Sequence, residues 1–164
     1  MRHVLFRSAL VFVCLAIWPA QAAEPGRWRD YVNFKYAYAV CYPANLLVPQ
    51  GESDAGDGQV FGGNDGAKLL VYGGYDVDGR SLADRMKSEK AEIVGRSGKV
   101  TYEALKGAWF VISGVDDQGV FYLKTIAVDG RLASLQLTYP AALKAIYDEV
   151  AAKLARCLRL ENQR

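Results

Sequence analysis

Histidine and cysteine are scarce in this sequence, which has one His and three Cys among 164 residues. The histidine, His3, and one cysteine, Cys14, lie in an N-terminal stretch that we expect to be removed. The remaining chain then has no imidazole, so it cannot form Ser-His or Cys-His nucleophile pairs or any His-containing metal site. These are among the commonest catalytic arrangements of secreted hydrolases.

Long hydrophobic runs are also missing, and the one apolar run is short. It spans Ala9–Trp18, follows Arg2 and Arg7, and precedes an A-x-A cleavage pattern at residues 20–22. This is the pattern of a secretory signal peptide over residues 1–22. A membrane span needs about twenty apolar residues, roughly twice this run. We therefore expect a mature chain from Ala23, periplasmic or secreted, with no membrane anchor after processing.

The mature chain has no excess of either charge. Without Arg2 and Arg7, 18 basic residues balance 18 acidic ones. No basic stripe suggests nucleic acid or an anionic membrane surface as a partner. We expect a protein partner, no nucleic acid and no cofactor.

Two cysteines remain, Cys41 and Cys157. In an oxidising compartment two cysteines are expected to form a disulfide. Two buried free thiols are the alternative. The bond would close a loop of over a hundred residues, for which the chain-entropy model gives about 4–5 kcal/mol.

The size of the mature chain, residues 23–164, predicts a single domain with one core. Its first strand is predicted at Phe34–Tyr42, where aromatic and small residues alternate up to Pro43. A second strand is predicted at Ala67–Tyr75. From Lys99 onward, strands and turns alternate, and the Asp129-Gly130 connection is the strongest hairpin signal. Four strands joined in this way predict an antiparallel meander.

Two helices are predicted, one before the meander and one after it. Ser81 can cap the first, with Asp84 three residues on, and Leu82, Met86 and Ile93 form its thin apolar stripe. The second runs from Pro140 to Leu158, with Pro140 at the first helical position. Its apolar face is expected to cover the sheet, with Cys157 meeting Cys41 on the small-residue face of the first strand. The apolar face of this second helix consists of Leu143, Ile146, Tyr147, Val150, Leu154 and Cys157.

These elements predict an α+β domain, an antiparallel sheet with helices packed against it. Their order resembles that of PsbP-like, Mog-like and DcrB-like domains. The resemblance lies in the opening "FKYAYAVCYPANL", the helix "SLADRMKSEKAEI", the meander and the last helix. It implies an α/β/α sandwich and a non-enzymatic role in binding or stabilising other proteins. It assigns no functional residue here.

The segment 51–66 is rich in glycine and aspartate. A loose calcium site is one interpretation, with Asp54, Asp57 and Asp65 as ligands, although an EF-hand spacing is not met. A phosphate-binding loop is disfavoured because the flanking strand and helix are missing. We favour two turns around a short strand, Gln59–Phe61, because Gly, Asp and Asn suit turns.

Tyrosine is abundant, with ten residues, many of them on predicted strand faces. Some could form an exposed aromatic surface for peptide or glycan. We favour rings that fill the edge of the core with the hydroxyl near solvent. The tyrosines concerned are Tyr36, Tyr38, Tyr42, Tyr72, Tyr102, Tyr122 and Tyr139.

Carboxylates could serve a hydrolase without histidine. Glu103, Asp116 and Asp117 are the candidates for acid-base hydrolysis of glycan, which needs two facing carboxylates. Their predicted places, a polar strand face and a hairpin turn, favour solvated surface. Ser81 and Ser88 lack the Lys that Ser-Lys catalysis requires.

The leading interpretation is therefore a secreted or periplasmic binding or accessory protein without catalytic activity. A carboxylate-dependent hydrolase of cell-wall glycan and a calcium-binding module are the alternatives.

Overall fold

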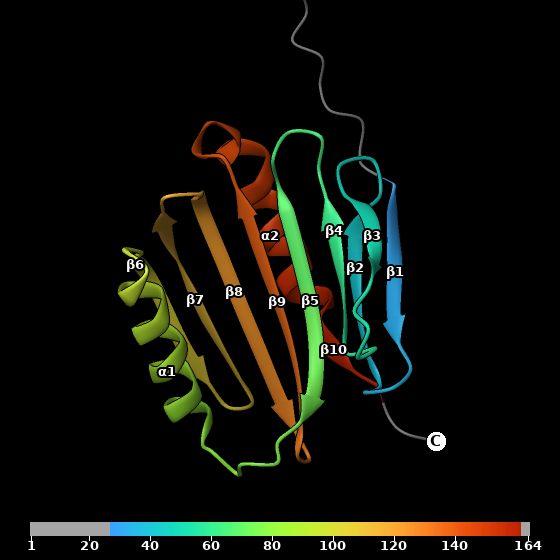
Figure 1. Ribbon diagram of the computed structural model, residues 1–164, viewed down its shortest axis with the longest axis vertical. Coiled ribbons are helices and arrows are strands. Elements are labelled where there is room, and N and C mark those ends of the chain that lie inside the picture. The colour runs from blue at the N-terminus through green and yellow to red at the C-terminus, as the bar shows by residue number, and fades with distance from the viewer. Residues whose placement is uncertain (1–26, 162–164) are drawn as a thin grey trace, which may run out of the picture.

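Residues 27–161, the part of the chain that this computed structural model describes, form two antiparallel sheets and two α-helices (Figure 1). The predicted leader, residues 1–22, lies outside the described residues. The large sheet has the order β3-β4-β5-β9-β8-β7-β6, and the small sheet has the order β1-β2-β10.

The strands of the large sheet are β3 (Val48–Glu52), β4 (Gly58–Gly62), β5 (Lys68–Tyr75), β6 (Lys99–Lys106), β7 (Trp109–Asp116), β8 (Gly119–Val128) and β9 (Arg131–Tyr139). Those of the small sheet are β1 (Trp28–Asn33), β2 (Tyr38–Pro43) and β10 (Arg159–Leu160). The helices are α1 (Leu82–Gly95) and α2 (Lys144–Cys157), the second preceded by a 3-10 turn at Ala141–Leu143.

The meander from β6 to β9 follows the prediction. Asp129 and Gly130 both have positive φ, 51° and 70°, as a type I′ hairpin turn requires. In the turn between β7 and β8, the Asp116 carboxylate accepts the backbone N–H groups of Gln118 at 2.9 Å and Gly119 at 3.1 Å. Local turn chemistry therefore sets the strand order of this half of the sheet.

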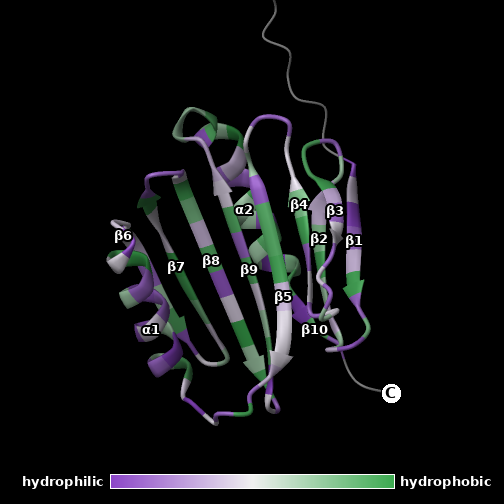
Figure 2. Cartoon of the chain, in the orientation of Figure 1, coloured by the Kyte–Doolittle hydropathy of each residue, from purple (hydrophilic) through white to green (hydrophobic). Residues whose placement is uncertain are grey.

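Helix α1 begins at the predicted cap. The Ser81 hydroxyl accepts the backbone N–H of Asp84 at 3.1 Å, and the Asp84 carboxylate accepts the Ser81 hydroxyl at 2.6 Å. Ile93 is the buried residue of α1, and hydrophilic residues, drawn in purple in Figure 2, recur along the helix. α1 thus packs lightly on one face of the sheet, over Phe110, Ile112, Phe121 and Leu123.

Helix α2 packs on the opposite face, which confirms the expected C-terminal helix on the sheet. Its buried residues are Tyr147, Val150, Ala151 and Leu154. Two details of the prediction are wrong. The α-helix begins at Lys144 rather than at Pro140, and Ile146 is 43% exposed. Leu143 lies in the 3-10 turn and is partly buried against the core, whereas Ile146 lies at the margin of the stripe formed by Tyr147, Val150 and Leu154.

The first predicted strand, Phe34–Tyr42, is also wrong in part. The structure has a turn at residues 34–37, where Ala37 adopts φ 50° and Phe34 is 90% exposed. The Asn33 side chain stabilises this turn by accepting the Tyr36 N–H at 3.0 Å. β1, which the sequence did not reveal, precedes the turn and pairs with β2.

The small sheet lies beside α2 on the same face of the large sheet (Figure 1). Tyr38 and Tyr42 of β2 point toward the large sheet, and the ring centres of Tyr42 and Phe61 lie 4.5 Å apart. We expected the small-residue face of the first strand to lie under the C-terminal helix. Instead, β2 lies alongside α2.

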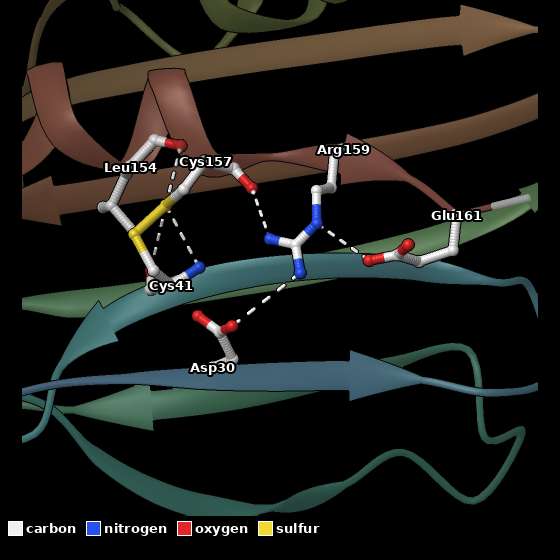
Figure 3. Close-up of polar contacts among 6 residues, drawn as sticks. All are labelled: Asp30, Cys41, Leu154, Cys157, Arg159 and Glu161. Carbon is white, nitrogen blue, oxygen red and sulfur yellow. Dashed lines mark hydrogen bonds and ion pairs between the residues drawn. A yellow bond between two sulfur atoms is a disulfide. The ribbon is translucent and has the colours of Figure 1, made fainter.

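A disulfide joins these neighbouring elements (Figure 3). Cys41 of β2 and Cys157 at the end of α2 have Cα atoms 5.7 Å apart. Next to the bond, Arg159 of β10 reaches Asp30 of β1 at 3.7 Å and Glu161 at 2.8 Å. The disulfide thus ties the small sheet to the end of the helix, and the Arg159–Asp30 pair joins β10 to β1 within the small sheet.

The layers are staggered across the large sheet. α1 covers β6, β7 and β8 on one face, whereas α2 and the small sheet lie over β4, β5, β9 and the adjoining edge of β8 on the other. Each face therefore keeps an uncovered part, and a groove lies in each.

Candidate functional site

A groove lined by tyrosines lies where α2 leaves the sheet uncovered. We call it the tyrosine groove, and its volume is about 360 Å³. Strands β6, β7, β8 and β9 supply one side, and α2 supplies the other. Its lining residues are Tyr102, Ser113, Tyr122, Tyr139, Lys144, Asp148, Ala151 and Ala152.

The floor of the groove follows from strand register. Tyr102 of β6 faces Ser113 of β7, and Ser113 faces Tyr122 of β8. Cross-strand neighbours share a face of the sheet, so the two phenol rings flank the small serine. Tyr102 is 58% exposed, and Tyr122 is half-buried. The groove therefore presents one open ring and one partly covered ring.

A charged pair lies on the wall of the groove. Lys144 donates to the Asp148 carboxylate at 2.6 Å, and the Tyr139 hydroxyl donates to its other oxygen at 2.7 Å. Partial burial acts to raise the pKa of Asp148, but these two hydrogen bonds outweigh it and hold that pKa below its usual value. Asp148 is therefore a carboxylate at neutral pH and fixes the position of the Tyr139 hydroxyl.

The phenols of Tyr122 and Tyr139 stay neutral at physiological pH because their pKa values are raised. Burial, with a smaller effect of Tyr102, raises the pKa of Tyr122 to about 12. Burial and the hydrogen bond to Asp148 raise the pKa of Tyr139 further above its ordinary value. A neutral phenol both donates and accepts hydrogen bonds, so the groove can pair with the backbone amides of a bound chain.

A tryptophan and a lysine extend this surface along the sheet. Lys124 lies 5.5 Å from the ring centre of Trp109 and donates to the Ala155 carbonyl of α2 at 2.5 Å. Burial lowers the pKa of Lys124. Its contacts hold the C-terminal half of α2 against β8 and keep the helix at the edge of the groove.

The favoured interpretation, rings at the edge of the core with the hydroxyl near solvent, fits the half-buried tyrosines. Tyr38, Tyr42 and Tyr139 are buried. Tyr36, Tyr72 and Tyr122 are intermediate, and Tyr102 is exposed. The core-edge and aromatic-surface interpretations thus both apply, each to different residues.

The glycine-rich segment forms turns around β4, as favoured. The carboxylates considered for calcium have separate contacts. Asp57 is bonded to the Ser53 hydroxyl, and Asp65 accepts the Tyr147 hydroxyl at 2.9 Å. Within residues 27–161, no three His, Cys, Asp or Glu side chains form a group that could hold a metal ion. Asp54, Asp57 and Asp65 are therefore not brought together.

The carboxylates considered for hydrolysis have structural contacts of their own. Glu103 pairs with Lys90 of α1 at 2.6 Å, and both are partly exposed. Asp116 holds the turn after β7, and Asp117 is the next residue of that turn. Ser88 lies on α1 and accepts a hydrogen bond from Arg80 at 3.3 Å.

The helix side of the groove was not anticipated from sequence. Lys144 and Asp148 have an (i, i+4) spacing, which is a signal for a surface pair on a helix. Ala151 and Ala152 gave no signal. Sequence periodicity assigns residues to faces of one element, but it does not show which face of a second element lies opposite.

Comparison with known proteins gives the fold. No family model matches the chain, and no curated protein matches it. It is similar to the solution structure of cyanobacterial PsbP (CyanoP) from Synechocystis sp. PCC 6803, with a TM-score of 0.62 and 12% identity, over 87% of this chain and 98% of that one. It also matches PA94 of Pseudomonas aeruginosa, a protein of unknown function described as a putative regulator, with a TM-score of 0.44 and 10% identity, over 85% of this chain and 100% of that one.

The likeness to CyanoP shows that the chain has a PsbP-like fold, as the order of its elements predicted. Among the helices of residues 27–161, none is both long and apolar enough to cross a membrane.

Proposed function

We propose that this protein is a non-enzymatic accessory or binding protein of the cell envelope, and that it binds a partner protein in the tyrosine groove. The observation that carries the proposal is the exposed Tyr102 beside the neutral phenol of Tyr122, in a groove of about 360 Å³. Tyrosines are enriched at protein interfaces because a ring buries apolar area while the hydroxyl keeps a hydrogen bond.

The groove suits an extended polypeptide segment. Its sheet side offers rings and hydroxyls, and its helix side offers the small residues Ala151 and Ala152, which leave room for a backbone. Rigid aromatic anchors of this kind lose little conformational entropy on binding. The Lys144–Asp148 pair at the wall supplies charge of both signs for polar side chains of the partner.

Export supports the same proposal. The leader pattern of residues 1–22 and the disulfide between Cys41 and Cys157 both suit an oxidising compartment outside the cytoplasm. N-terminal sequencing of the protein from a periplasmic or culture fraction should begin at Ala23. Recovery of the protein from the cytosol with Met1 intact would contradict export.

Site-specific photo-crosslinking tests the groove. A benzoylphenylalanine residue at position 102 should give one discrete adduct in living cells, whose partner is identified by mass spectrometry. The matched control is position 94 on α1, on the opposite face of the sheet and 56% exposed. The purified partner should lose roughly tenfold or more in affinity with Tyr102→Ala, as for an aromatic anchor. Equal adducts from both positions, or no effect of Tyr102→Ala on affinity, would refute the proposal.

A further inference from the structure

A second cavity lies on the other face of the sheet, between α1 and strands β5, β9 and β8. Its volume is about 180 Å³. Its floor is a row of cross-strand neighbours, in which Tyr72 faces Ser134 and Ser134 faces Thr125. These three hydroxyls lie together in one row of the sheet, and side chains of α1 and of the preceding loop form the wall.

One charged side chain of this cavity has no ion-pair partner. Arg85 is paired with Asp76, and Arg80 lies 3.8 Å from Asp78 and donates to Ser88. Glu89 has neither an ion pair nor a side-chain hydrogen bond within residues 27–161. It is partly buried, so its charge is incompletely solvated. Arg85 and Arg80 also line the cavity, but Asp76 and Asp78 offset their charges, so Glu89 is the carboxylate that a ligand of positive charge would neutralise.

The hydroxyl floor also has unused hydrogen-bonding capacity. Thr125 and Ser134 are both buried, and their hydroxyl oxygens lie 2.8 Å apart. Each hydroxyl oxygen has two lone pairs, so one bond between them leaves acceptor sites free. With Tyr72, whose phenol pKa is raised by burial and by the negative charge of Glu89, the floor offers further acceptors near the carboxylate.

We propose that this cavity binds a primary ammonium group, held by the Glu89 carboxylate and by the hydroxyls of Tyr72 and Ser134. An ammonium has three N–H donors and no acceptor, which matches one carboxylate and a set of hydroxyl oxygens. Burial, with repulsion from Glu92, raises the pKa of Glu89 against weaker opposing effects of Arg96 and Arg80. A bound cation would reverse that shift. The ligand is either a free alkylamine or a lysine side chain of a partner.

Gly74 lies next to open space on the lining of the cavity. A Cβ at this position would have no heavy atom within 4 Å. A longer side chain would occupy that space without removing a polar group of the cavity. This position therefore allows the cavity to be closed separately from the loss of Glu89.

The test is an NMR titration of the intact mature protein with n-butylammonium at pH 8, and with n-butanol as the neutral isostere. Backbone amides of Tyr72, Ser88, Glu89 and Ser134 should shift with n-butylammonium and not with n-butanol. Glu89→Gln should weaken binding roughly tenfold or more, because a charge-assisted hydrogen bond is lost. Gly74→Leu should abolish it. Glu149→Gln is the matched control, since Glu149 is exposed on α2, on the opposite face of the large sheet.

A second titration distinguishes the source of the ammonium. A blocked Gly-Lys-Gly peptide should bind if a lysine side chain of a partner is the ligand, and the same peptide with norleucine should not. Binding of n-butylammonium without binding of the peptide assigns the site to a free amine. Equal shifts with n-butanol, unchanged affinity in Glu89→Gln, or no shift with either amine would overturn the proposal. None of these outcomes depends on the tyrosine groove, which lies on the opposite face.

Discussion

Tyr147 and Asp65 lie 82 residues apart in the sequence, and the Tyr147 hydroxyl donates to the Asp65 carboxylate at 2.9 Å. Tyr147 is completely buried in α2, and its ring stacks on that of Tyr139 with 5.2 Å between centres. Asp65 also accepts the backbone N–H of Ala67 at 3.1 Å. One aspartate of the glycine-rich segment thus fastens the turn between β4 and β5 to the C-terminal helix.

Tyr147→Phe removes this hydrogen bond and keeps the ring. We expect the free energy of unfolding to fall by about 1 kcal/mol, since the carboxylate is exposed and can bond water instead. Urea denaturation measures the change. Tyr75→Phe is the control, because the Tyr75 side chain is 54% exposed. Equal losses in the two variants would show that the bond to Asp65 adds nothing.

Gly73 and Gly74 are neighbours in β5 with opposite surroundings. A Cβ on Gly73 would lie 2.5 Å from ring carbons of Tyr38 and 3.1 Å from the Leu132 carbonyl oxygen. Tyr38 is fully buried and donates to the Asp57 carbonyl at 2.9 Å, so its ring cannot easily move.

Gly73→Ala should therefore lower the free energy of unfolding by about 1–3 kcal/mol, as overpacking does. Gly74→Ala has open space and should leave the stability unchanged or raise it by a few tenths of a kcal/mol. Urea midpoints of the two variants compare them directly. Similar midpoints would mean that β5 and β2 do not approach as closely as the structure shows.

The pKa of Glu89 makes stability depend on pH. Burial, with repulsion from Glu92, raises this pKa in the folded protein. The folded state then binds the proton more tightly than the unfolded state, so the free energy of unfolding falls as pH rises from the ordinary glutamate pKa through the raised one. Thermal melts of Glu89→Gln should lack this decrease in the same interval. A wild-type minus variant difference that is flat with pH would contradict the raised pKa.

The disulfide should contribute strongly to stability. Replacing Cys41 and Cys157 together by alanine should lower the free energy of unfolding by about 4 kcal/mol on the chain-entropy model. Wild-type protein in reductant should unfold at a similarly low urea concentration. An unchanged urea midpoint in both experiments would show that the bond constrains little. Mass spectrometry after alkylation of the unreduced protein should find neither cysteine modified.

Sequence predicts the parts of this fold that depend on neighbouring residues. The cap at Ser81 and the turn at Asp129-Gly130 are read from two to four residues, and both are confirmed. The turn at residues 34–37 was missed because Phe34 and Tyr36 continue the alternation of the strand beyond it. What ends that alternation is the Asn33 side chain, and its contact with the Gly56 carbonyl at 3.0 Å comes from a distant loop.

The candidate site was predictable only as a list of tyrosines. Tyr102 and Tyr122 come together through the register of β6, β7 and β8, and Lys144 and Asp148 line the same groove because α2 lies over β9 and β8. Neither the strand register nor the position of α2 over the sheet can be predicted from the residue spacing within one strand or helix. Tertiary packing therefore decides which of the seven tyrosines remains open.

The sulfur–sulfur bond also determines how the molecule would respond to being pulled. Every strand of the large sheet lies between residues 41 and 157, inside the covalent ring. A mechanical load applied outside the ring, before β2 and after β10, would pass from Cys41 directly to Cys157. The small sheet would part first, and the seven strands would bear no tension until the bond is reduced.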